Sequence, residues 1–281
     1  MPILTELNLY PIKSCAGMSV PEATLTRAGL AFGGIHDREW MVVREDGQFM
    51  TQRDYPRMAL IVPRLDDGAL VLSAPGMAPL TLALAVVHDT PTVQVQVWDD
   101  TVQASECGAA GAAWFSQALG VACRLVRFHA DAVRLASRTW TGAIEAPTLF
   151  SDGYPLLLAG RSSLEDLNQK LVAAGRAALP MNRFRPNLVV EGMEAFEEDY
   201  VETFELGAAR LKPVKPCPRC PMPSVDQASG CVGPDPLDIL QAYRRKAQVD
   251  DAVCFGMNCI VTAGEGERLR VGQAVAFVLA F

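Results

Sequence analysis

The chain has 281 residues, enough for one large or two ordinary domains, and half of them are hydrophobic, so disorder is excluded. The formal net charge of −7 argues against non-specific binding to nucleic acid. The first residues lack the basic segment of a signal peptide, and no apolar run approaches the roughly 18 residues that a membrane span requires. We therefore expect a cytoplasmic protein with reduced cysteines, no membrane segment and no nucleic-acid partner.

The first part of the chain has the pattern of β-structure. Asp46-Gly47 and Asp66-Asp67-Gly68 are turn sequences, and each predicts a hairpin between the strands on either side. A helix is predicted over residues 109–119. Many short strands joined by turns favour a barrel or a sandwich. The predicted strands are residues 4–10, 39–45, 48–52, 58–65, 69–73, 79–84, 92–98 and 124–128.

Residues 130–148 have mixed polarity and include Pro147, and we interpret them as the connection between two halves. Beyond them, Ser162-Ser163-Leu164-Glu165 predicts a capping box that opens a helix. A second helix is predicted over residues 236–246, and residues 191–199 are predicted to form an acidic loop. The remaining predicted strands are residues 155–159, 188–190, 208–215, 259–263 and 273–279.

Residues 215–226, with the sequence K-P-C-P-R-C-P-M-P-S-V-D, combine two thiols, a guanidinium and four prolines. Proline disfavours a helix and removes backbone donors, so we interpret the segment as a stiffened loop that orients Cys217, Arg219 and Cys220. Three interpretations stay open. The pair could be half of a zinc site completed by Cys231, Cys254 or Cys259, or a thioredoxin-like redox pair, which the prolines disfavour. It could also supply one thiolate to a soft, high-valent metal, with Arg219 stabilising negative charge.

Basic residues with polar neighbours recur at predicted strand ends. Lys13-Ser14 follows the first strand, Arg38 precedes another, and Arg185 and Asn187 precede a third. Each alone is typical of a solvated or ion-paired side chain. Together with Arg219 they could clamp a phosphorylated, anionic ligand, because a guanidinium matches phosphate in a bidentate manner.

In this order the motifs resemble the MOSC family, and more closely bacterial relatives of the mitochondrial amidoxime-reducing component. Each motif alone is weak, but the ordered set covers essentially the whole chain. The resemblance implies a mainly β fold, with a MOSC N-terminal β-barrel domain over residues 1–125 and a MOSC β-barrel domain with a few helices over residues 140–281. The motifs are Y-P-I-K-S-C-A-G at 10–17, H-D-R-E-W at 36–40, R-F-R-P-N at 183–187, C-P-R-C at 217–220, S-V-D at 224–226, F-G at 255–256 and V-G at 271–272.

The resemblance also implies a molybdenum cofactor, a pyranopterin dithiolene with one phosphate. Cys220 matches the family's molybdenum ligand, and Cys217 would be its neighbour. Asn258 replaces an aromatic residue that lies beside the cofactor in eukaryotic members, and Gly153-Tyr154 replaces a hydroxyl-bearing pair. The other matched cofactor positions are Lys13, Ser14, Arg38 and Arg185 for the pterin and phosphate, Pro218 and Arg219 beside the metal ligand, and Asn187 and residues 151–154 in corresponding stretches.

The implied activity is an oxidoreductase that reduces small N-hydroxylated substrates, namely hydroxylamines, amidoximes or N-hydroxylated bases. No ferredoxin-like module follows residue 281, so we expect a separate electron donor, a small redox protein fed by a nicotinamide–flavin reductase. Two alternatives stay open: a non-catalytic sulfur or molybdenum-cofactor carrier, and a zinc-stabilised binding module.

Overall fold

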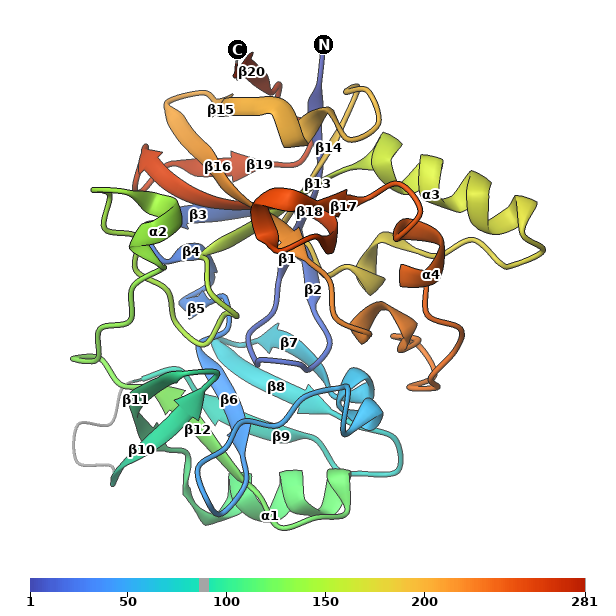
Figure 1. Cartoon of the computed structure of the whole chain (residues 1–281). Coiled ribbons are helices and arrows are strands. Elements are labelled where there is room, and N and C mark those ends of the chain that lie inside the picture. Colours follow the sequence, from blue (N-terminus) through green and yellow to red (C-terminus); the bar gives the residue numbers. More distant parts are fainter. Residues whose placement is uncertain (86–90, 281) are drawn as a thin grey trace.

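The chain is mainly β in the computed structural model, which describes residues 1–85 and 91–280, and this confirms the predicted fold class (Figure 1). The largest sheet has the strand order β2-β1-β14-β13-β18-β16-β15-β20, and β17 pairs with β18. In it β13 and β14 run parallel, and the other paired strands are antiparallel. Its strands are β1 (Ile3–Leu9), β2 (Met18–Val20), β13 (Leu156–Gly160), β14 (Leu188–Glu191), β15 (Val201–Leu206), β16 (Ala209–Pro218), β17 (Arg245–Lys246), β18 (Ala252–Ala263) and β20 (Ala276–Leu279).

Three smaller sheets complete the β-structure, with the orders β10-β11-β12-β6, β19-β3-β4-β5 and β7-β8-β9. Their strands are β3 (Glu22–Thr26), β4 (Gly29–Phe32), β5 (Ile35–His36), β6 (Trp40–Val43), β7 (Val62–Asp66), β8 (Ala69–Ser73), β9 (Leu80–Ala83), β10 (Thr92–Val97), β11 (Asp100–Glu106), β12 (Arg124–Phe128) and β19 (Arg268–Arg270). The α-helices are α1 (Gly108–Leu119), α2 (Arg138–Thr141), α3 (Arg161–Ala173) and α4 (Leu237–Leu240). Short 3-10 turns are η1 (Pro56–Leu60), η2 (Met181–Arg183), η3 (Glu197–Tyr200), η4 (Met222–Ser224) and η5 (Ala247–Val249).

Segments far apart in the sequence share sheets. β1 pairs with β14, so the start of the chain lies inside the large sheet with strands from its second half. β19, near the other end, pairs with β3. In Figure 1 the two termini lie at the same end of the molecule, and α1 lies at the opposite end. A domain boundary between residues 125 and 140 stays a prediction.

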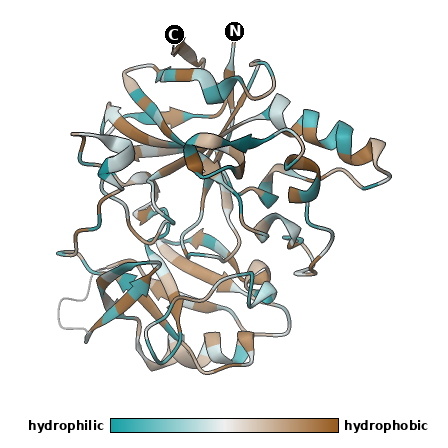
Figure 2. Ribbon diagram, in the orientation of Figure 1, coloured by the Kyte–Doolittle hydropathy of each residue, from teal (hydrophilic) through white to brown (hydrophobic). Residues whose placement is uncertain are grey.

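One large hydrophobic core joins the sheets. It contains side chains from both halves of the chain, among them Leu7, Leu25, Phe115, Leu158 and Phe204. A second core holds α3 and α4 against the central strands β14, β13 and β18 of the large sheet, and its leucines on α3 keep the predicted helical spacing. In Figure 2 the ribbon of α3 alternates between teal and brown along its length, as expected for a helix with one buried face.

The proline-rich stretch begins as a strand. β16 continues to Pro218, three residues past the predicted end, and includes Pro213 and Pro216. The ladder with β18 shifts register at the prolines, and β15 pairs only with residues 209–211 of β16. Proline is tolerated at such bulges and free edges because no neighbour needs its missing N–H. The predicted stiffened loop therefore starts at Arg219.

Several predicted elements are confirmed. The β7–β8 hairpin, α1, and the strand at 124–128 form at or near the predicted residues. Strands β2, β3, β4, β5, β11 and β15 were not predicted from the sequence. They are short or lie beside turns without the Asn-Gly or Asp-Gly signal, so their pairing comes from tertiary contacts.

The predicted hairpin at 39–52 forms only in part. Gly47 has a left-handed φ of 83°, and the Met50 N–H donates to Val42 O at 2.9 Å. Residues 48–52 nevertheless form no strand, and β6 pairs with β12 instead.

Two helix predictions were wrong in detail. α3 starts at Arg161 without a capping box, because the Ser162 hydroxyl donates to Met193 O and the Ser163 hydroxyl to the buried Glu198 carboxylate. The helix predicted over 236–246 is limited to α4. Arg245 and Lys246 pair with β18 instead, which ends the helical stretch.

No helix within residues 1–85 and 91–280 is both long enough and apolar enough to cross a membrane.

Gly256 on β18 provides a test of the sheet's geometry. Its φ is +76°, and a Cβ there would lie 2.8 Å from the carbonyl oxygen of Leu158 on β13. Gly266 has a similar φ of +87° with nothing within 4 Å of its virtual Cβ. We expect Gly266→Ala to lower the free energy of unfolding by about 1 kcal/mol and Gly256→Ala by roughly 3 kcal/mol or more, because only the latter also pushes strands apart. Urea denaturation measures both, and equal losses would contradict the described contact.

Candidate functional site

The pairing of β1 with β14 brings two of the predicted motifs together. The Asn8 N–H donates to Asn187 O at 2.8 Å, and the Asn187 side-chain amide donates back to Asn8 O at 3.1 Å. The Asn187 Oδ1 accepts from the Leu157 N–H at 3.1 Å and from Arg38 Nη1 at 3.2 Å. The buried Asn187 side chain therefore ties β1, β13 and the 36–40 turn to the start of β14.

The 36–40 turn holds the 10–14 turn from the other side. The Asp37 carboxylate accepts from the Tyr10 N–H at 2.8 Å, and the Arg38 N–H donates to Tyr10 O at 2.7 Å. The Lys13 N–H donates to Trp40 O at 2.8 Å. These hydrogen bonds hold the segment that carries Lys13 and Ser14 against the 36–40 turn.

Two arginines lie over the ring of Tyr10. The guanidinium carbons of Arg38 and Arg185 lie 4.2 Å and 4.3 Å from the ring centroid. A π face partly compensates a positive charge, but less than a carboxylate does. Arg38 also has an ion pair with Asp37, whereas Arg185 has no carboxylate partner among the described residues.

Arg185 is a buried cation with an unused donor. It is only 7% exposed, and its Nη2 has no hydrogen-bond acceptor among residues 1–85 and 91–280. Its Nη1 makes one long contact of 3.4 Å to Gln227 Oε1. Burial lowers the pKa of Arg185 to about 10, although the nearby Tyr10 opposes that shift. The free N–H group and the uncompensated charge both favour an anion at this position.

Lys13 extends the positive charge toward the 150–152 segment. Its ammonium donates to Phe150 O at 2.9 Å and forms an ion pair with Asp152. Burial lowers the pKa of Lys13, and the charges of Arg134 and Arg38 act in the same direction while Asp152 opposes them. The Asp152 side chain is 75% exposed, so this ion pair lies at the rim of the cluster.

The loop that carries Cys220 is held by the 183–187 turn. The buried Phe184 stacks on Phe255 of β18 with ring centroids 4.0 Å apart, which anchors the turn. Arg183 donates to Pro223 O at 3.0 Å and to the Asp226 carboxylate at 2.6 Å. Arg219 donates to Phe184 O at 3.0 Å. The loop is therefore fixed on both sides of Cys220 to the same turn that carries Arg185.

The two cysteines of this loop have different surroundings. The Cys217 thiol contacts the Arg219 guanidinium, whose Nη1 lies 3.2 Å from the Cys217 sulfur. It also neighbours the buried Cys254, where burial raises the pKa to about 12 and Cys217 acts in the same direction. Cys220 is partly exposed, and its sulfur has no hydrogen bond within the described part of the chain. Cys220 is therefore the thiol free to accept a ligand.

The zinc interpretation is not supported. All eight cysteines are free, and the described residues contain no group of three or more Cys, His, Asp or Glu side chains that could hold a metal ion.

Two glutamines join the cluster without any signal in the sequence. Gln52, fully buried, and Gln227 exchange amide hydrogen bonds of 2.9 and 3.2 Å across a separation of 175 residues. Gln227 lies in the loop after Cys220 and also contacts Arg185. The pair ties the 49–53 segment of the first half to the cysteine loop. Single glutamines have no characteristic spacing, so only the fold reveals them.

The site contains a concentration of left-handed backbone. Ser14, Arg38 and Arg185 have φ values of 64°, 51° and 57°, although none is glycine. Such conformations cost free energy and persist where surrounding contacts fix them, as they commonly do at functional sites.

The structure brings most of the predicted residues together. Lys13, Ser14, Arg38, Arg185 and Asn187 form one connected group, and Arg219 links it to the cysteine loop. Pro218 ends β16 immediately before Arg219, and Cys220 follows it. Asn258 lies on β18 opposite Leu157 and Lys215, and within the described residues its side chain makes none of the hydrogen bonds that join the group.

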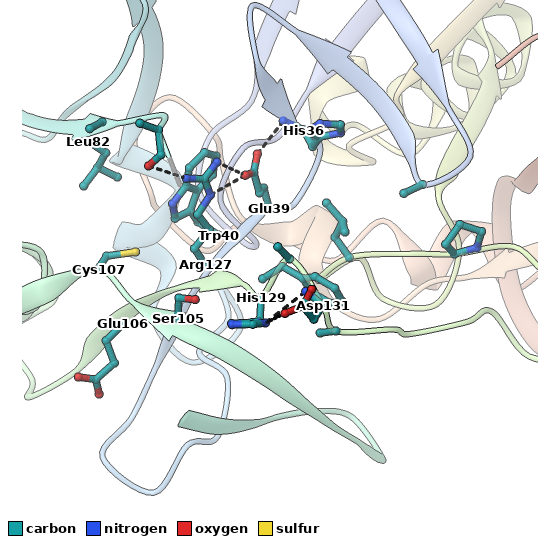
Figure 3. Close-up of a pocket in the computed structure, with 18 of the residues that line it drawn as sticks. His36, Glu39, Trp40, Leu82, Ser105, Glu106, Cys107, Arg127, His129 and Asp131 are labelled. Carbon is teal, nitrogen blue, oxygen red and sulfur yellow. Dashed lines mark hydrogen bonds and ion pairs between the residues drawn. The ribbon is translucent and has the colours of Figure 1, made fainter. Parts of the chain in front are cut away.

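A cavity in the structure lies away from this group of residues. Its volume is about 900 Å³. The residues that line it include His36, Glu39, Trp40, Cys107 and Arg127 (Figure 3). None of the predicted site residues lines it, and its Arg127 is already paired with Glu39 at 2.6 Å. Its rim includes Ala85 and Pro91, which flank the residues outside the described ranges. The uncompensated cations and the free thiol therefore define the candidate site, and the cavity does not.

Arg185 provides a test of anion binding. We expect Arg185→Met to raise the free energy of unfolding by roughly 1–3 kcal/mol, because a buried charge without a counter-ion destabilises the fold. Added phosphate should stabilise the wild type against urea and leave Arg185→Met unaffected. This phosphate effect should fade as the pH rises toward 10, where Arg185, with its lowered pKa, loses its charge.

The matched control is Arg244→Met. Arg244 is equally buried but has bidentate contacts of 2.8 and 3.1 Å with Asp199. Arg244→Met should lower the free energy of unfolding by roughly 3–5 kcal/mol, because Asp199 then stays buried without its main partner. Destabilisation by both substitutions would contradict the described imbalance of charge.

Comparison with known proteins gives a consistent result. Residues 1–122 match the MOSC N-terminal beta barrel domain, and residues 145–276 match the MOSC domain. The chain is 35% identical over 245 residues to mitochondrial amidoxime reducing component 2 of Bos taurus, covering 86% of this chain and 72% of the relative. It is 36% identical over 286 residues to component 2 of Rattus norvegicus, covering 97% and 82%.

Component 1 of Homo sapiens is 32% identical over 246 residues, covering 86% of this chain and 72% of the relative. Among solved structures, the YuaD protein of Bacillus subtilis covers 98% of this chain and is itself covered to 94%. Its TM-score of 0.43 and identity of 11% are too low to support a conclusion. The family matches and the curated relatives confirm the predicted family: the chain belongs to the MOSC family, with a MOSC N-terminal β-barrel domain ahead of a MOSC domain.

Proposed function

We propose that the chain is a molybdenum-cofactor-dependent oxidoreductase that reduces N-hydroxylated compounds, such as hydroxylamines, amidoximes or N-hydroxylated bases. The observation that carries this proposal is the buried group of cations around Tyr10, with an unpaired Arg185, beside the loop of a free Cys220. The relatives named as amidoxime reducing components support the same type of reaction.

The residues present fit a phosphorylated metal cofactor. Arg185 has an unpaired buried N–H group, and Arg219 Nε is also buried without an acceptor within the described residues. Guanidinium groups are suited to phosphate, and a thiolate is a soft donor suited to molybdenum. The cofactor, when bound, would supply the two-electron oxygen-atom chemistry.

Each part of the site would have its own task. Lys13, Ser14, Arg38 and Arg185 would hold the phosphate and the pterin. Asn187, Pro218, Arg219 and Asn258 would line the cofactor, and Cys220 would bind the metal. Arg183 and Asp226 would act through the loop, because their ion pair fixes the segment that follows Cys220.

The overall reaction fixes what must be delivered. Reduction of R–NHOH to R–NH₂ breaks the N–O bond, consumes two electrons and two protons, and releases water. The electrons would come from a separate donor, a small redox protein fed by a nicotinamide–flavin reductase, in the cytoplasm.

The two cysteines give the sharpest test of this site. We expect Cys220→Ala to abolish hydroxylamine reduction, because this substitution removes the thiol proposed to bind the metal. Cys217→Ala should lower the rate only several-fold, since Cys217 contacts Arg219 and Cys254 rather than a ligand. Rates with a reduced viologen dye as electron source measure both. Equal losses of activity in both variants would contradict the different roles proposed for Cys217 and Cys220. A persulfide on Cys220 in protein without molybdenum would instead support the sulfur carrier.

The need for a separate donor can be tested with the wild type. The purified chain should not oxidise NADH in the presence of a hydroxylamine, because the proposed site contains no flavin or other group that accepts a hydride. A reduced viologen dye should restore reduction. Turnover with NADH and the chain alone would contradict the proposed donor, while leaving the cofactor assignment intact.

A further inference from the structure

Trp98 occupies an unusual position at the β10–β11 turn. Val97 and Asp100 pair across this hairpin, so Trp98 and Asp99 form its two-residue loop. Trp98 has a φ of +55°, a region that hairpin loops usually fill with glycine or asparagine. A bulky side chain there is strained, so surrounding contacts must hold it in place.

Contacts to the cation group provide that restraint. The Trp98 indole N–H donates to Asp152 Oδ1 at 3.1 Å, and Asp152 also pairs with Lys13. The buried Arg134 lies 2.7 Å from the Asp100 carboxylate and donates to Ser151 O at 2.6 Å. The hairpin tip is therefore fixed to the 151–152 segment at two points, and the indole lies next to Lys13.

The indole nevertheless keeps an open surface. Trp98 is 43% exposed, although Phe49 packs edge-on at 5.1 Å and the guanidinium carbon of Arg53 lies 4.9 Å from its ring. The Arg53 Nε donates to Thr51 Oγ1 of its own loop at 3.3 Å, and among the described residues Arg53 has no ion pair with a carboxylate. An exposed indole and a free planar cation are thus presented together.

The same pair is tied to the cysteine loop. Gln52 directly precedes Arg53 and exchanges hydrogen bonds with Gln227, which lies beyond Cys220. Trp98 is therefore linked to Lys13 through Asp152, and the segment that carries Arg53 is linked to the Cys220 loop.

We propose that Trp98 and Arg53 form a stacking platform that selects planar, delocalised N-hydroxylated substrates over small aliphatic ones. The inference rests on the proposed function and adds the residues that determine its specificity. Aromatic faces stack on planar conjugated groups, and a guanidinium stacks in the same way. A short aliphatic hydroxylamine has no planar surface and gains nothing from the platform.

The test compares an aromatic amidoxime, benzamidoxime, with N-methylhydroxylamine. Trp98→Ala should lower the ratio of their kcat/KM values by roughly tenfold, and Trp98→Phe, which keeps a planar ring, should recover part of it. The control is Trp140→Ala. Trp140 is also partly buried and has a cation, Lys215, 5.2 Å from its ring, but among the described residues its side chain makes no hydrogen bond to the site. It should leave the ratio at the wild-type value. An unchanged ratio in Trp98→Ala, or the same change in both alanine variants, would overturn the proposal.

A binding measurement separates this proposal from the proposed function. Calorimetry should show that benzamidine, a planar compound that cannot be reduced, binds the wild type more tightly than acetamidine, and that Trp98→Ala removes most of the difference. Molybdenum content should match between Trp98→Ala and the wild type. A wild type without molybdenum or N-reduction would refute the proposed function, and the binding comparison would still decide on the platform. Equal binding of both amidines by the wild type would refute the platform alone.

Discussion

The candidate site depends on the burial of several positive charges without an equal number of carboxylates. Arg38 and Arg185 lie over the ring of Tyr10, and the ammonium of Lys13 lies over the ring of Phe49. Among the described residues, Lys13 and Arg38 form ion pairs with carboxylates, whereas Arg185 forms none. Burial of a charged group is costly unless it is paired, so the fold must hold Arg185 in place through the packing and hydrogen bonds of its neighbours. This imbalance is the physical reason to expect an anion there.

The strand order makes this convergence possible. β1 lies between β2 and β14, so the turn after β1 meets the turn before β14 although more than half of the chain separates them. β16 then delivers Cys220 from the far side of β18 and β13. Left-handed residues at Ser14, Arg38 and Arg185 turn the chain sharply at these strand ends. The geometry of the site therefore depends on the sheet, because loss of the pairing between β1 and β14 would separate the cations.

Sequence patterns predicted the parts of the chain where local signals agree with the fold. The Asp-Asp-Gly sequence forms the predicted hairpin turn, and the helix at 109–119 and the strand at 124–128 form where their hydrophobic patterns predict them. The ordered motifs also singled out the residues that meet around Tyr10. Other features arise only from tertiary contacts. The Gln52–Gln227 pair has no spacing signal, Ser162 and Ser163 donate to residues 193 and 198 instead of capping α3, and β16 tolerates its prolines because its outer edge is free. Asn258 matched a family position, but among the described residues its side chain makes no hydrogen bond to the cation group.

The central claim is that the cations and Cys220 together hold a phosphorylated molybdenum cofactor. Elemental analysis of the purified wild-type chain, expressed in cells that make the cofactor, tests this most directly, because it reports metal and phosphorus without any assumption about substrate or donor. We expect the protein to contain molybdenum and cofactor phosphorus in equal amounts, with no stoichiometric zinc. Zinc in place of molybdenum, or a full complement of molybdenum without phosphorus, would contradict it.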